Sequence, residues 1–66
     1  MKTYNVFKSG STQVGTIKAT CITKAVKSFI NTLDKPVKYE LNNLQYASIR
    51  YLDNYSICSD FVLMEA

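Results

Sequence analysis

Side chains that commonly carry out catalysis are scarce in this sequence of 66 residues. It has no histidine, two cysteines and five acidic residues. General acid–base and nucleophilic catalysis need a positioned pair, such as a serine or cysteine beside a histidine, or two adjacent carboxylates. We therefore expect a protein that is not an enzyme. Four of the acids are expected beside turns, on the polar side of a strand or at the C-terminus: Asp34, Glu40, Asp53 and Glu65.

Asp60 is the exception among the acids, because it lies between Ser59 and Phe61 in an otherwise apolar segment. Strand alternation favours an outward side chain on an open sheet face over a catalytic carboxylate. The two glycines, Gly10 and Gly15, are not followed by the Gly-Lys-Ser/Thr of a phosphate-binding loop. Without histidine, two distant cysteines make no ligand set for zinc or another transition metal. The sequence thus predicts neither a metal nor a cofactor.

The positive charges are concentrated in the first part of the chain. The chain through Lys38 holds seven lysines against one acid, a net charge of +6, and the rest holds one arginine against four acids, a net charge of −3, which recovers the total of +3. Such asymmetry can mark a surface for nucleic acid or other anions. Lys24 and Lys27 form the centre of the best candidate patch, and Lys35 and Lys38, which follow the expected helix, extend it. The alternative is that these lysines are the ordinary solvated side of an amphipathic helix.

Tyrosine is the second enrichment, with five residues in a chain that has no tryptophan. Interfaces favour tyrosine because it offers contact area at a low cost in conformational entropy, but it is also a good strand and core residue. Alternation places Tyr39 and Tyr51 toward the core, whereas Tyr46 and Tyr55 are candidate contact residues. Tyr46 shares a strand face with Arg50, a combination that also suits stacking on nucleic-acid bases.

One segment, residues 20–33, has the apolar periodicity of an amphipathic helix, with apolar residues at i, i+3 and i+4. Thr20 is expected to cap its N-terminus. Pro36 ends it, because proline lacks a backbone N–H and disfavours helical geometry in the preceding residue. The apolar stripe comprises Ile22, Ala25, Val26, Phe29, Ile30 and Leu33, and the side that faces water or a partner comprises Lys24, Lys27, Ser28 and Asn31.

Short alternating segments on both sides of the helix predict strands. A turn at residues 9–13 joins the first two strands into a hairpin. Asn42-Asn43 is expected to form a tight turn, since asparagine tolerates positive φ. An extended loop is the alternative at 37–41, and it leaves four strands instead of five. The predicted strands are residues 2–8, 14–19, 37–41, 44–52 and 57–64.

One amphipathic helix and four to five short strands predict a two-layer α+β fold, in the order β-β-α-β-β-β, with the helix packed on one face of an antiparallel sheet. The other face is left to solvent or to a partner. Residues 1–66 form one small domain of marginal stability. We expect a soluble intracellular protein, because no apolar run approaches the ~20 residues of a membrane span and no signal peptide is apparent. In that compartment Cys21 and Cys58 are expected to be reduced and buried.

The first part of the chain resembles a class of very small phage-encoded proteins. The likeness lies in Tyr4-Asn5-Val6-Phe7, in Gly10, in Gly15-Thr16-Ile17-Lys18-Ala19-Thr20 and in the lysine-bearing helix through Ala25. The layout is similar to that of a small inhibitor among the anti-CRISPR proteins of type I-F systems, which has one helix on a five-stranded antiparallel sheet. The order of elements is similar over the whole chain.

The resemblance implies a protein of phage origin in the host cytoplasm that binds a host protein complex and inhibits it, with a CRISPR–Cas nucleoprotein as the leading target. In that class lysines occupy the place of a nucleic-acid backbone. The alternatives are a nucleic-acid-binding accessory domain with weak contacts through the same lysines, and a self-associating structural subunit, so that a monomer and a homodimer both stay open. The candidate partner-binding residues are Lys24, Lys27, Asn31, Lys35, Tyr46, Arg50 and Tyr55.

Overall fold

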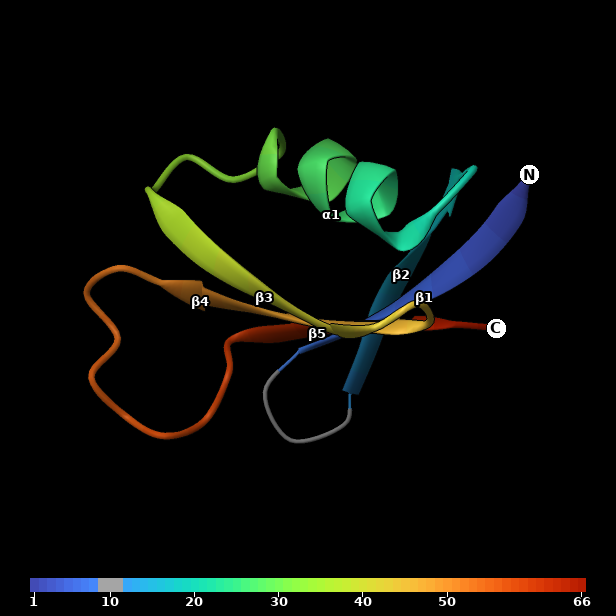
Figure 1. Cartoon of the computed structure of the whole chain (residues 1–66). Coiled ribbons are helices and arrows are strands. Elements are labelled where there is room, and N and C mark those ends of the chain that lie inside the picture. The colour runs from blue at the N-terminus through green and yellow to red at the C-terminus, as the bar shows by residue number, and fades with distance from the viewer. Residues whose placement is uncertain (9–11) are drawn as a thin grey trace.

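The computed structural model describes residues 1–8 and 12–66. In these residues one helix lies across one face of a five-stranded antiparallel sheet (Figure 1). The predicted two-layer α+β class and the predicted order of elements are confirmed. The elements are β1 (Lys2–Lys8), β2 (Thr12–Ala19), α1 (Ile22–Ile30), β3 (Val37–Asn43), β4 (Tyr46–Tyr51) and β5 (Phe61–Glu65).

The strand order across the sheet is β2-β1-β5-β4-β3, with every neighbouring pair antiparallel. The C-terminal strand β5 is therefore the central one. Helix α1 connects the two edge strands, β2 and β3, and passes over the strands between them (Figure 1). Since β2 and β3 run parallel, the connection between them crosses over one face of the sheet, and α1 covers this face, whereas the other face has no covering element in the described chain.

Helix α1 is shorter at both ends than the periodicity predicts. Its N-cap is Cys21, with φ −155° and ψ 168°, and not Thr20. At the other end Thr32 donates to the carbonyl of Phe29 from both its backbone N–H, at 2.9 Å, and its hydroxyl, at 2.7 Å. These i to i+3 hydrogen bonds tighten the chain into a turn. The helix therefore ends at Ile30, before Leu33.

The bounds of four strands, β2 to β5, also differ from the prediction. Residues 37–43 form a strand, so the loop alternative is wrong, and the turn lies at Leu44 and Gln45. Asn43 ends the strand because its Oδ1 accepts a hydrogen bond from the N–H of Gln45 at 2.8 Å. Strand β5 begins at Phe61 and not at residue 57. The predicted turn at 9–13 lies partly outside the described residues, and its last two residues already belong to β2.

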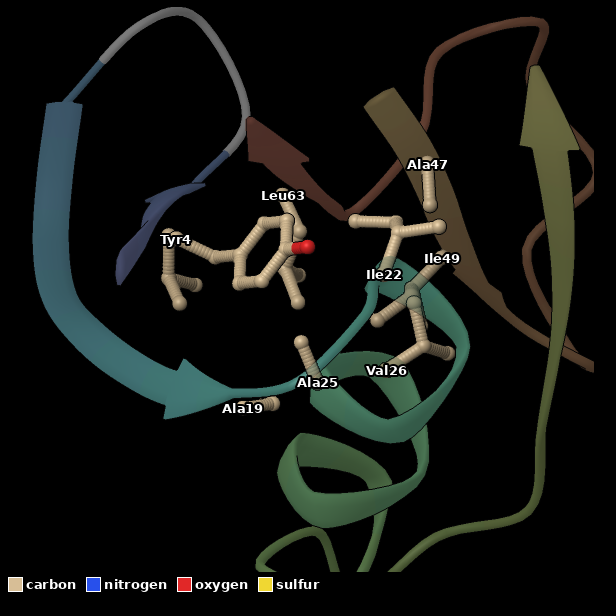
Figure 2. Packing of buried hydrophobic residues seen from close by; sticks show 9 residues of the cluster. Tyr4, Ala19, Ile22, Ala25, Val26, Ala47, Ile49 and Leu63 are labelled. Atoms are coloured by element: carbon tan, nitrogen blue, oxygen red, sulfur yellow. The ribbon is translucent and has the colours of Figure 1, made fainter. Parts of the chain in front are cut away.

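The core lies between α1 and the face of the sheet beneath it (Figure 2). The helix contributes the first half of its predicted stripe, and the strands contribute alternate residues. Tyr51 packs edge-on against Phe61, at 5.9 Å between ring centroids, and Phe29 packs on the same ring at 4.9 Å. This arrangement extends the core toward one end of the sheet. The buried residues are Tyr4, Val6, Ala19, Ile22, Ala25, Val26, Ala47, Ile49 and Leu63.

Tyr4 brings a polar atom into this core. The residue is fully buried, and Figure 2 shows its ring lying among the clustered side chains with the hydroxyl directed into the cluster. The hydroxyl oxygen has no hydrogen-bond partner in the described residues. Burying a hydroxyl without a partner costs free energy of folding, whereas the ring itself contributes apolar area to the core. The hydroxyl therefore opposes the stability that the ring supplies.

We predict that Tyr4→Phe stabilises the protein, because it removes the unpaired hydroxyl and keeps the ring. The free energy of unfolding is expected to rise by on the order of 1 kcal/mol, which corresponds to a higher Tm by roughly 4–8 °C in a domain of this size. Thermal unfolding followed by circular dichroism measures the change. Tyr39→Phe is the matched control, because Tyr39 is 42% exposed, and it should leave Tm nearly unchanged. A lower Tm for Tyr4→Phe would show that the hydroxyl stabilises the fold.

Candidate contact surface

The uncovered face of the sheet, called the open face below, carries an apolar patch at its centre. Phe7 of β1 is the register partner of Val62 of β5, and Met64 of β5 is the partner of Tyr46 of β4. Their neighbours in the strands, such as Leu63, are buried under the helix, so these four alternate residues point the other way. Met64 is 43% exposed, and the other three are half-buried. Phe7, Tyr46, Val62 and Met64 are called the apolar patch.

Next to the apolar patch, the open face becomes polar toward edge strand β3. Arg50 of β4 lies directly opposite Lys38 of β3, and Ser48 lies opposite Glu40. Arg50 donates from Nη2 to the carbonyl of Ile57 at 3.1 Å. This bond links the strand to the loop between β4 and β5, and Arg50 is half-buried.

Residues 52–60, the loop between β4 and β5, are fastened at the base by Asp60. One carboxylate oxygen of Asp60 accepts hydrogen bonds from the N–H of Tyr51 and from Nδ2 of Asn54, both at 2.8 Å. The N–H of Asp60 donates to the carbonyl of Ile49 at 2.9 Å. Asp60 therefore closes the loop. It precedes β5, so the expectation of an outward strand residue on the open sheet face is wrong.

Inside the loop, short polar side chains bind the backbone. Asn54 accepts from the N–H of Ser56 at 2.8 Å and donates to the carbonyl of Cys58 at 3.1 Å, and Ser56 Oγ accepts from the N–H of Cys58 at 3.2 Å. The two apolar side chains between these residues point outward. Tyr55 and Ile57 are each 94% exposed, and they are called the loop tip. The polar network thus presents two large apolar groups to solvent.

The helix carries a separate group of the predicted residues. Lys24, Lys27 and Asn31 are exposed residues of α1 and its C-cap. The helix lies over the sheet face opposite the open face (Figure 1). Asn31 is the C-cap residue, and its backbone N–H donates to the carbonyl of Lys27 at 3.2 Å. Neither lysine joins an ion pair within residues 1–8 and 12–66. The predicted residues therefore do not form one site.

Lys35 belongs to neither group. Its Nζ lies 4.0 Å from Asp53 Oδ2 and 5.5 Å from the centroid of the Tyr51 ring. It therefore links the connection after α1 to the start of the loop at residues 52–60. Both charges of the pair are largely exposed, so the pair contributes little to stability.

Both cysteines are free, as predicted, but they are exposed and not buried. Cys21 makes no side-chain capping hydrogen bond, yet the backbone N–H of Lys24 in the first helical turn favours its thiolate. This interaction lowers the pKa of the Cys21 thiol, against an opposing contribution from desolvation and with help from the N–H of Thr23 and the charge of Lys24. This thiol defines no site by itself.

The comparisons with known proteins give no family for the chain. It matches no protein-family model, no curated protein and no solved structure. In the described residues no three metal-binding side chains come together. None of the helices there combines the length and the apolar character that a membrane crossing needs.

The sequence reasoning identified three residues on this surface, Tyr46, Arg50 and Tyr55, and missed the rest. The sequence signal for the missed residues was that Val62 and Met64 flank the inward-facing Leu63 in β5, and that Ile57 is a further apolar residue near them in the sequence. Lys38, which the sequence groups with the helix lysines, lies on this surface beside Arg50. The missed residues are Phe7, Ile57, Val62 and Met64.

We predict that Asp60→Ala loosens the loop at residues 52–60, because it removes the acceptor of the Tyr51 and Asn54 hydrogen bonds. The loss of a charged acceptor at a partly buried site is expected to cost about 1.5–3 kcal/mol of unfolding free energy. Urea unfolding gives the free energy, and hydrogen exchange at the Tyr51 amide reports the opening of the loop. Asp53→Ala is the control, since it removes only an exposed ion pair and should cost less than about 1 kcal/mol. Equal losses in the two variants would contradict this role of Asp60.

Proposed function

We propose that the protein is a non-catalytic binding protein that attaches to another protein through the open face of its sheet and the loop tip. The observation that carries this proposal is the apolar patch on the three central strands of an uncovered face. Apolar side chains that cluster on an exposed surface commonly mark an interaction site. The loop tip adds two further apolar groups on a hydrogen-bonded frame.

The composition of this surface fits a protein partner. Aromatic residues, methionine and arginine are the types enriched at protein interfaces, whereas lysine and acidic residues are depleted at their centres. The apolar patch has two aromatic residues and a methionine, and the charges of Lys38, Glu40 and Arg50 lie beside it toward edge strand β3. This order, an apolar centre with a charged rim, is the usual arrangement of an interface.

The proposed activity is inhibition by occupancy of a surface on a host protein complex. The resemblance of residues 4–25 to small phage-encoded inhibitors supports this choice and makes a CRISPR–Cas complex in the host cytoplasm the first target to test. Occupancy requires contact area and no reaction chemistry. A domain of 66 residues that offers one uncovered face supplies such area.

A second candidate function is nucleic-acid binding through the helix. Lys24 and Lys27 are exposed one turn apart on α1, and neither is engaged in an ion pair within the described residues. Phosphate contacts of this kind produce affinity that falls steeply with salt concentration. The two candidates use opposite layers of the molecule, so variants of one surface leave the other intact.

Capture of partners from a nuclease-treated bacterial lysate separates these functions. We predict that the wild-type protein retains a stoichiometric protein complex and that the double variant Tyr55→Ser/Ile57→Ser retains at least about tenfold less, because interface aromatic residues often contribute 2 kcal/mol or more. Both side chains are almost fully exposed, so the fold should be unchanged by circular dichroism. Mass spectrometry and gel densitometry measure the retained complex.

Two control variants complete the experiment. Leu44→Ser removes another largely exposed apolar residue, at the turn between β3 and β4, and should retain the complex. Lys24→Glu/Lys27→Glu should also retain it. If only the lysine variant loses binding, or if nucleic acid alone is captured, the proposal is overturned in favour of the second candidate. If the protein captures only further copies of itself, the proposal is overturned in favour of a self-associating subunit.

A further inference from the structure

The polar end of the open face contains a pocket of about 230 Å³. It lies where β3, β4 and the end of the loop at residues 52–60 meet. Its size suits one side chain of a partner and is small for a drug-sized ligand. The lining residues are Lys38, Tyr39, Glu40, Ser48, Arg50 and Ser59.

Two positively charged side chains line this pocket side by side, Lys38 and Arg50. Lys38 and Arg50 are directly opposite register partners on antiparallel strands, and like charges at such positions are destabilising. Within residues 1–8 and 12–66 the ion pairs join other lysines to Glu65 and Asp53, so neither Lys38 nor Arg50 has a carboxylate within 4.0 Å. An anion between the two would remove the repulsion.

The pocket also has hydrogen-bond donors for an anion. Arg50 has five N–H donors and uses Nη2 for the carbonyl of Ile57. Ser48 Oγ accepts from Asn42 Nδ2 at 3.3 Å, so its own hydroxyl hydrogen is available for donation. A guanidinium and a carboxylate form two parallel hydrogen bonds, which is the strongest common geometry for this pair.

Glu40 determines which anion fits. It lines the same pocket, opposite Ser48 and two residues from Lys38 on the same strand. The pocket therefore has a net charge of +1, from two cations and one carboxylate. A single carboxylate balances this net charge, whereas a doubly charged phosphate exceeds it and meets twice the repulsion from Glu40 that a carboxylate meets.

We propose that this pocket binds one aspartate or glutamate side chain of the protein that covers the open face. The inference rests on the proposed function, since it names the chemistry that the partner brings to the rim of the apolar patch. The partner's carboxylate lies between Lys38 and Arg50, and its aliphatic neighbours cover the apolar patch. The acidic residue fixes the register of the partner on the sheet.

Arg50 is the single arginine of the sequence, so its Nε–Hε signal is an unambiguous NMR probe of the pocket. The ligand is the capped peptide acetyl-Ala-Glu-Ala-amide, and the matched peptide with glutamine is its control. We expect saturable shifts of the Arg50 signal with the glutamate peptide and none with the glutamine peptide. No shift, or equal shifts with both peptides, would overturn the proposal.

Three variants of the protein are expected to bind the same peptide more weakly, more tightly and as the wild type does. Lys38→Gln should weaken binding at least about threefold, and Glu40→Gln should strengthen it, because these changes remove an attractive and a repulsive charge. Lys18→Gln is the matched control on the open face, on edge strand β2, and should bind as the wild type does. The Tm of Lys38→Gln should not fall, because the substitution relieves the like-charge pair. Unchanged binding in Lys38→Gln, or tighter binding of inorganic phosphate than of the peptide, would contradict a carboxylate site.

The capture experiment separates this inference from the proposed function. Lys38→Gln should retain several-fold less of the partner complex than Lys18→Gln. If Lys38→Gln retains the complex fully while Tyr55→Ser/Ile57→Ser loses it, the carboxylate site is wrong and the binding surface stands. If none of these variants affects capture, both proposals fail.

Discussion

The structure depends on how much of the sheet α1 can cover, because this area determines which sheet residues are buried and which stay exposed. Nine residues of helix are about 14 Å long and about 10 Å wide, whereas five strands span about 19 Å between the edge strands. The helix can approach the sheet closely because three contact positions are alanines, at 19, 25 and 47. Even so, it protects only the middle of one face. Tyr39 and Leu41 of edge strand β3 stay 42% and 43% exposed, and the opposite face has no covering layer within the described residues.

The helix and most strands could be predicted because their apolar periodicity follows from burial on one side. Ile22, Ala25 and Val26 are buried, as the i, i+3, i+4 pattern requires. The loop at residues 52–60 could not be predicted in this way. Ile57 and Cys58 resemble strand residues, but their conformation is determined by side-chain hydrogen bonds to the backbone, which carry no periodicity.

The candidate surface was predicted in part for a related reason. Tyr46 and Arg50 share a strand face by alternation alone, so they could be paired from the sequence. The apolar patch could not be predicted from the sequence, because it forms only when the C-terminal strand lies between β1 and β4. This strand order depends on tertiary packing. Once Val62 and Met64 occupy the centre of the sheet, they join residues 7 and 46 into one surface. The same pairing separates the helix lysines from this surface.

The central claim is that the open face is where this protein meets its partner. The protein has two methionines, Met1 and Met64, and they allow the most direct test. Met64 lies in the apolar patch, whereas Met1 is 92% exposed at the chain terminus. Methyl NMR of protein labelled at methionine, recorded before and after addition of the captured complex, reports on both positions at once. The Met64 methyl signal is expected to shift or broaden while that of Met1 stays sharp. An unchanged Met64 signal in a sample where the complex has formed would show that the partner binds elsewhere.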